Sequence, residues 1–302
     1  MSEIKWPMAE ANRISSMLNL VLGTDRFPVK VDQVAVEYSR QCFADSPVDK
    51  VDAQDLEGFE GMLAANKAHS KWLILYNSEV SSEGRKRFTV AHEFGHYLLH
   101  RHQQDRFQCG NDDISTGDGK RDIETEADLF ASTLLMPLDD FRRQVLGQPI
   151  SFDLLGHCAD RYGVSLTAAA LRWTEIAEKR AVLVASRDDH MLWAKANQAA
   201  FKSGAYFATR KRTIELPSSA LAHSYNCEAI NQTQSTKAQL WFPREPSTMQ
   251  LTEMTRGAGQ YDYSLTLLLM PDAEWQKPQH DEEEPAEDTF DRFVRNGQPL
   301  VR

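Results

Sequence analysis

The chain has 302 residues, 41% of them hydrophobic and 26% charged, with a formal net charge of −10. This composition is typical of a soluble globular protein with one or two domains, and the negative charge argues against a general nucleic-acid binder. No apolar run approaches the length of a membrane-spanning helix, and the first residues lack a signal-peptide pattern, so we expect a cytoplasmic protein without a membrane partner. Four scattered cysteines without a CxxC pair predict free thiols.

The first 80 residues predict two helices and one strand. Apolar residues recur at helical spacing over 8–22 and over 31–42. Cys42 continues the second apolar series, so we expect its side chain in the core. The run KWLILYN at 71–77 predicts a strand.

The next predicted helix, over 87–101, contains the motif HExxH as His92, Glu93 and His96. Because a helix advances about 100° per residue, the two histidines lie on one face and can bind one metal ion. Zinc in such a site activates a water molecule, and Glu93 is placed to accept its proton and pass it to the leaving amine. The alternative is a salt-bridged helix surface without a metal.

A third metal ligand is available on the following helix, which begins near Ile123 and ends at Pro137. Glu124 can complete the site, and Asp128, one turn later, can accept a hydrogen bond from a ligating histidine. His100 lies a further turn, about 6 Å, along the first helix. We therefore predict that His100, like His102, is structural or faces solvent.

The polar segment 103–122 between these helices predicts a long loop, and it contains Cys109. A thiolate is a good fourth zinc ligand that would displace the nucleophilic water, so Cys109 is a candidate inhibitory ligand. The alternative is an ordinary loop cysteine near Phe107.

Residues 151–176 predict two short helices joined at Gly163. Only Arg172 is basic after the turn, whereas a DNA-recognition helix needs several polar and basic side chains. We therefore expect these helices to complete the first domain. Beyond 178, the runs AVLVAS (181–186), AQLWFP (238–243) and YSLTLLLMP (263–271) predict strands of a second domain.

The segment 202–212 combines basic and aromatic residues, which suits single-stranded DNA because the charges track phosphates and the rings stack on bases. Its candidate DNA-binding residues are Lys202, Tyr206, Arg210, Lys211 and Arg212. The alternative is a strand with aromatic residues in the core and a solvated basic turn. The acidic segment 276–302 is expected to be disordered.

The patterns RKRFTVAHEFGHYLLH and IETEADLFASTLLMP closely resemble the ImmA/IrrE family of metallopeptidases. The resemblance implies His92, His96 and Glu124 as zinc ligands and Glu93 as the catalytic base. It also implies that the substrate is a helix-turn-helix repressor of the Xre type. Asp128 stands where most members have asparagine, and it keeps a hydrogen-bond acceptor.

The predicted order of a peptidase followed by a GAF-like sensor is similar to family members of CBASS antiphage operons, for which single-stranded DNA is the implied activator. The predicted fold is α+β. A mostly helical zincin-like metallopeptidase domain with a small sheet (1–178) is followed by a smaller α/β GAF-like domain (179–275). The strand at 71–77 would present an edge to an extended substrate. A catalytically idle repressor-binding regulator is the alternative function, which the intact Glu93 argues against.

Overall fold

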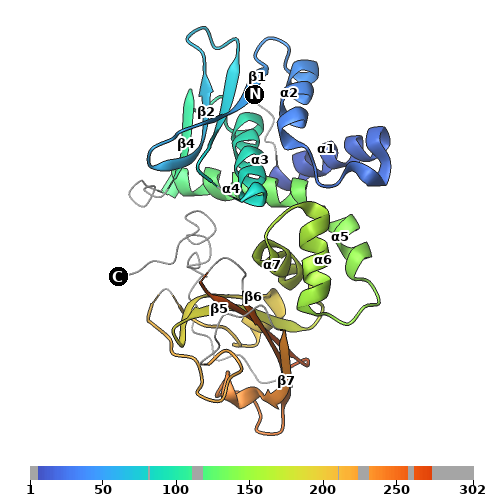
Figure 1. The fold of residues 1–302 in the computed structure, drawn as a ribbon, viewed down its shortest axis with the longest axis vertical. Helices are drawn as coiled ribbons and strands as arrows, with labels where there is room; N and C mark the ends of the chain where they lie inside the picture. Colours follow the sequence, from blue (N-terminus) through green and yellow to red (C-terminus); the bar gives the residue numbers. More distant parts are fainter. Residues whose placement is uncertain are drawn as a thin grey trace. The chain divides into compact units, whose positions relative to one another are not determined.

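The computed structural model describes residues 6–80, 82–110, 118–209, 211–223, 231–257 and 262–273, without the side chains of 110 and 118–122. The chain divides into two compact units (Figure 1). Unit 1 comprises 1–149 and 157–165, and unit 2 comprises 150–156 and 166–302. The predicted domain boundary at 178 stays a prediction, and the predicted disorder at 276–302 lies outside the described residues.

Helices make up most of unit 1, in keeping with the predicted mixed α+β architecture. They are α1 (Pro7–Leu22), α2 (Val31–Cys42), α3 (Glu83–Leu99), α4 (Asp118–Leu135) and α5 (Leu138–Val145). Helix α3 packs on α2, α4 and the sheet, as Figure 1 shows. Its Phe94 ring meets Phe130 of α4 edge-on, with the ring centres 5.7 Å apart. Both rings are fully buried, so this contact lies in the core of unit 1.

The sheet of unit 1 has the order β1-β3-β2-β4. Its strands are β1 (Val48–Gln54), β2 (Phe59–Ala65), β3 (Trp72–Asn77) and β4 (Arg106–Gly110). The strand predicted at 71–77 is β3, but it lies between β1 and β2, so the prediction that it presents a substrate edge was wrong. A continuous apolar run such as WLIL is typical of a strand with neighbours on both sides.

Two further predictions for unit 1 were wrong. The polar segment 103–122 is not all loop, because Arg106–Gly110 form β4, antiparallel to β2. This mostly polar stretch forms a strand because the backbone of β2 supplies the hydrogen-bonding partner and Phe107 is buried. Cys42 is exposed rather than in the core. It is the last residue of α2, and the helix passes beyond the core after Tyr38 and Ser39, which are buried.

The predicted helix pair is present as α6 (Phe152–Tyr162) and α7 (Leu166–Ile176). Gly163 between them has a φ of 60°, a left-handed conformation that favours glycine. The first half of α6 and all of α7 belong to unit 2. There α7 packs on β5 and β6. That both helices complete the first domain stays a prediction.

Unit 2 contains a five-stranded sheet of order β6-β5-β9-β8-β7, antiparallel throughout. Its elements are β5 (Arg180–Arg187), β6 (His190–Ala196), α8 (Gln198–Lys202), β7 (Gln232–Lys237), β8 (Gln250–Gly257) and β9 (Ser264–Met270). The apolar runs at 181–186 and 263–271 predict β5 and β9. In the structure both strands are almost wholly buried. The GAF-like assignment of this unit stays a prediction.

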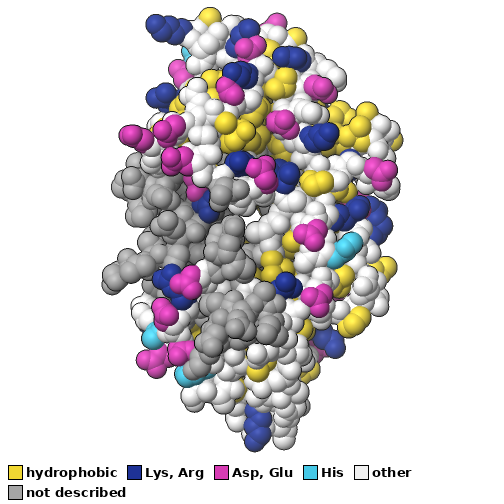
Figure 2. All heavy atoms as spheres, viewed as in Figure 1, with side chains coloured by type: hydrophobic (Ala, Val, Ile, Leu, Met, Phe, Trp, Pro, Cys, Tyr) yellow, Lys and Arg dark blue, Asp and Glu magenta, His cyan; other side chains and the backbone are white. Residues whose placement is uncertain are grey.

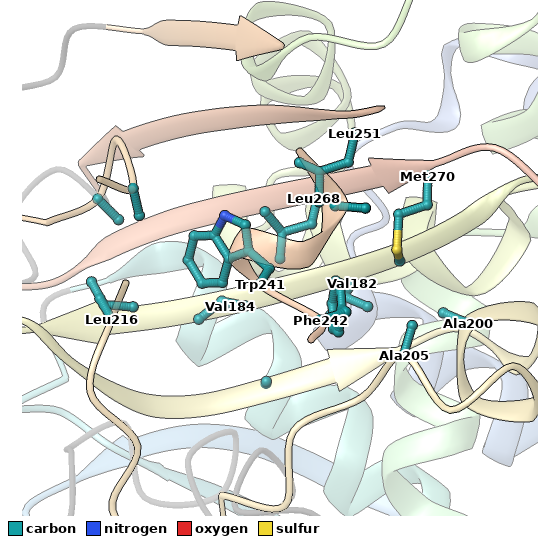
Figure 3. Packing of buried hydrophobic residues seen from close by; sticks show 14 of the residues in the cluster. Val182, Val184, Ala200, Ala205, Leu216, Trp241, Phe242, Leu251, Leu268 and Met270 are labelled. Carbon is teal, nitrogen blue, oxygen red and sulfur yellow. The ribbon is translucent and has the colours of Figure 1, made fainter. Parts of the chain in front are cut away.

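One face of this sheet packs against the cluster in Figure 3, which includes Val182, Leu251 and Leu268 from three strands. Trp241 and Phe242 join this cluster from a turn, not from a strand. The run AQLWFP was therefore wrongly predicted as a strand. A short 3₁₀ turn at Ala238–Leu240 directs the two rings into the core, while the preceding strand β7 is polar and escaped prediction.

None of the helices in the described ranges combines the length and apolarity needed to cross a bilayer. On the face drawn in Figure 2, acidic and basic side chains are interspersed.

Candidate metal centre

Helix α3 carries His92 and His96 one turn apart, and both side chains are buried. Their Nε2 atoms lie 3.0 Å from each other. The helix begins at Ser82, whose hydroxyl accepts a hydrogen bond from the backbone N–H of Arg85. The predicted spacing thus brings both imidazoles to one point.

Glu124 of α4 reaches the same point. Its Oε2 lies 3.1 Å from Nε2 of His92, and its Oε1 lies 3.3 Å from Nε2 of His96. The two helices come this close because Gly95 faces α4. A Cβ atom at Gly95 would lie 3.2 Å from the Cα atom of Ala127 and 3.1 Å from the ring of Phe130. A larger residue would push α4, and with it Glu124, away from the histidines.

Cys109 of β4 is the fourth group at this point. Its Sγ lies 3.0 Å from Nε2 of His92 and 3.6 Å from Nε2 of His96. The distance to Oε2 of Glu124 is 3.7 Å. Strand pairing sets this position, because Cys109 stands opposite Gly61 of β2.

The donor atoms of His92, His96, Cys109 and Glu124 all lie within 4.8 Å of one another. Zinc bonds of about 2.0–2.3 Å in a tetrahedron separate neighbouring ligand atoms by about 3.3–3.7 Å. The donor spacing is close to these values, and imidazole, thiolate and carboxylate are groups that zinc takes. These four residues therefore fit a tetrahedral metal ion.

The other nitrogen of each imidazole also has a partner. Nδ1 of His92 lies 2.7 Å from Oδ1 of Asp128. Nδ1 of His96 lies 3.1 Å from Nδ1 of His100, whose Nε2 lies 2.9 Å from Oε2 of Glu126. His100 is buried, so of the two roles predicted for it the structural one holds, while His102 is exposed. Sequence reasoning missed Glu126, and the i, i+4 spacing of His96 and His100 was the available signal.

Glu93 lies beside this cluster and is fully buried. Neither of its carboxylate oxygens has a hydrogen-bond partner among the described residues. Burial raises the pKa of this carboxyl to about 8, and the nearby His92 and the Cys109 thiol offset only part of the effect. Gly61 leaves room for it, because a Cβ atom there would lie 2.5 Å from Oε1 of Glu93. A buried carboxyl without a partner costs free energy and is typical of functional sites.

The surroundings shift the pKa values of the donor groups in different directions. Burial lowers the pKa of His96 to about 4. Burial also opposes a proton on His92, but Cys109, Asp128 and Glu124 outweigh it and raise the pKa of His92. The pKa of Glu124 is held low against burial by the two histidines. These contacts favour a proton on His92, which lies between the carboxylates of Asp128 and Glu124.

Comparison with known proteins links this site to a peptidase family. Residues 50–174 match the family model of the IrrE N-terminal-like domain, a peptidase family. The matched region includes every donor above, so the part of the chain that carries the site is similar to the IrrE N-terminal-like domain. No curated protein matched the sequence.

A solved structure, a Mycobacterium tuberculosis transcriptional regulator, is similar in fold, with a TM-score of 0.53 and 13% identity. The similarity covers 87% of this chain and 76% of that chain. At this identity it shows a shared fold alone.

We expect the chain to bind zinc at this site with an affinity that rises with pH. Below the raised pKa of His92 the ion must displace the proton of this ring, and above that pKa the ring proton no longer competes. Burial raises the pKa of the Cys109 thiol, so binding by this group displaces a further proton. Each displaced proton changes the affinity by about tenfold per pH unit. Competition with a chromogenic chelator over a pH series measures this dependence.

The replacements His92→Ala, His96→Ala and Glu124→Ala should abolish tight binding, and His102→Ala, an exposed histidine just beyond α3, should leave it unchanged. Affinity that stays constant over the pH series, or survives these replacements, would contradict the proposed ligands.

Proposed function

We propose that the chain is a zinc-dependent endopeptidase that cleaves a helix-turn-helix repressor of the Xre type. Cleavage would derepress a stress-response or antiphage operon, such as a CBASS operon, in the cytoplasm. The observation that carries this proposal is the buried, unpartnered Glu93 beside four convergent metal donors. The family match of residues 50–174 supports peptidase activity, and the similar structure bears the name of a transcriptional regulator.

The proposed roles follow from the contacts. His92, His96 and Glu124 would hold the ion, and Asp128 would fix the ring of His92 by accepting its Nδ1–H. When bound, zinc polarises a carbonyl group and lowers the pKa of water to about 7. Glu93 accepts a proton from the attacking water and delivers it to the leaving amine. A carboxyl whose pKa lies near neutrality is suited to both transfers.

Strand β4 is the candidate docking edge for an extended substrate, in place of β3. It is one of the two edge strands of its sheet, and among the described residues it pairs with β2 alone. An extended peptide adds to such an edge through main-chain hydrogen bonds. Because Cys109 lies on the same strand, a peptide along β4 would pass the donors.

Cys109 is proposed as the restraint on activity. Its thiolate would occupy the fourth ligand position and exclude water, so activation requires the end of β4 to move. Phe107, two residues earlier, is buried and stacks on the ring of His96 with centres 4.6 Å apart. The movement would therefore be confined to the residues that follow Phe107.

The proposed signal is single-stranded DNA bound by unit 2. Lys202, Lys211 and Arg212 are exposed, and Tyr206 is half exposed beside the ring of Phe201. Arg210 lies outside the described residues.

The neighbouring Phe207 packs against Phe242 instead, and the described residues of 202–212 beyond α8 form no strand. Exposed charge next to an accessible ring suits a nucleic-acid strand.

Glu93→Gln should lower the rate of repressor cleavage by about 10²–10⁴-fold and leave zinc content unchanged, because glutamine cannot accept the proton. Mass spectrometry of the partner repressor after incubation measures the products. Intact repressor with the unmodified chain under inducing conditions would favour the alternative, a regulator that binds the repressor without cutting it.

Cys109→Ser should raise cleavage in the absence of inducer by about tenfold, equivalent to about 1.4 kcal/mol of lost restraint. Cys42→Ser, which replaces an exposed thiol, serves as the matched control. If the serine variant cleaves no faster than the unmodified chain, Cys109 does not restrain the activity.

Labelled single-stranded DNA should bind with an affinity that falls with salt, with a log–log slope of about 0.7 per phosphate contact. Fluorescence anisotropy measures the slope, and a combined Lys211→Glu and Arg212→Glu change should reduce it. Lys67→Glu, at an exposed lysine of unit 1, is the control. Absence of salt-dependent binding removes DNA as the signal.

A further inference from the structure

The two histidines of the HExxH motif are supported differently. His92 contacts a carboxylate directly, with 2.7 Å between its Nδ1 and Oδ1 of Asp128. His96 has no carboxylate at its Nδ1 and contacts another imidazole instead, at 3.1 Å from Nδ1 of His100. The carboxylate follows one step further, where Oε2 of Glu126 lies 2.9 Å from Nε2 of His100. A second histidine is thus inserted between this candidate ligand and its carboxylate.

The contact between two imidazoles limits where the ring protons can be. One Nδ1 must donate and the other must accept. If Nε2 of His96 binds the metal, its proton is on Nδ1 and is donated to His100. His100 then carries its own proton on Nε2 and donates it to Glu126. Every contact in this series has one donor and one acceptor, and the reverse direction would put a proton on the metal-binding nitrogen of His96.

The surroundings hold this arrangement in place. His100 is 1% exposed, and its backbone N–H donates to the carbonyl oxygen of His96 at 2.8 Å. Phe107 stacks on His96 and also lies beside the His100 ring, with centres 6.4 Å apart. Glu126, by contrast, has 46% of its side chain exposed. The series therefore runs from the buried donors to the surface of α4.

We infer that His100 and Glu126 are positioning residues that fix the tautomer and the ring orientation of His96 for metal binding. This inference rests on the proposed function, because it requires a metal at His96. Partners of this kind raise the basicity of a ligating histidine and restrict its rotation, and their loss typically lowers metal affinity by about 10–100-fold. Asp128 supplies the same support to His92 in one step.

Four variants of the full chain test the inference by zinc affinity, measured in competition with a chromogenic chelator. His100→Leu removes both contacts and should lower affinity by about 10–100-fold, and Glu126→Ala should lower it by about tenfold. His100→Gln should keep most of the affinity, because its amide can accept from His96 and donate to Glu126. Glu83→Ala removes an exposed carboxylate from the first turn of α3 and should change nothing.

Proton–nitrogen NMR of the histidine rings in the zinc-bound protein provides a second readout. The Nδ1 proton of His96 should be present and hydrogen-bonded in the unmodified chain and in His100→Gln, and should lose its hydrogen-bond shift in His100→Leu. If His100→Leu fails to fold, the half-exposed Glu126 position still allows the affinity test.

The outcomes separate the two proposals. A chain that binds no zinc overturns the proposed function and this inference with it. A chain that binds zinc, with His100→Leu and Glu126→Ala within twofold of its affinity and an unchanged His96 resonance, overturns the inference and leaves the metal centre standing.

Discussion

The close approach of α3 to α4 is the contact on which the rest of the site depends. It exists because Gly95 presents no side chain to Ala127 and Phe130. Glu124 and Asp128 flank Ala127 on α4, so the same contact brings one carboxylate to the metal donors and another to Nδ1 of His92. Packing of apolar and small residues thus sets the positions of the polar ones, which is how a precise polar site can be held in a buried place.

A second close approach occurs on the opposite side of the same helix. Positions 93 and 95 differ by about 200° around a helix, so Glu93 points away from α4 when Gly95 faces it. There it meets β2 at Gly61, again a residue without a side chain. The next strand places Cys109 opposite Gly61. Helix α3 is therefore enclosed by glycine contacts on two sides, with His92 and His96 between them.

The local part of the site could be predicted from the sequence, because helical spacing alone relates His92 to His96 and Glu124 to Asp128. The contacts between separate elements could not be predicted from the sequence. Strand β4 lies in a polar stretch with Phe107 as its one large apolar residue, too few for an apolar pattern, and its pairing with β2 is a tertiary contact. Likewise His100 seemed too distant for a role, because spacing along α3 measures its reach to the metal and not to the ring of His96. Cys42 was misplaced because periodicity does not reveal where a helix leaves the core.

The pattern of satisfied and unsatisfied groups separates the two functional readings. The four donors contact one another and, through Asp128 and His100, further partners, so their burial is largely compensated within the chain. Glu93 is different, because its carboxylate is fully buried and lacks a partner among the described residues. A metal site that served only to hold the fold, or to bind a repressor, would gain nothing from that cost, and an apolar residue at position 93 would remove it. A group whose burial raises its pKa beside a metal site is instead what proton transfer requires. The unpaired carboxylate therefore favours a peptidase over an idle binding protein.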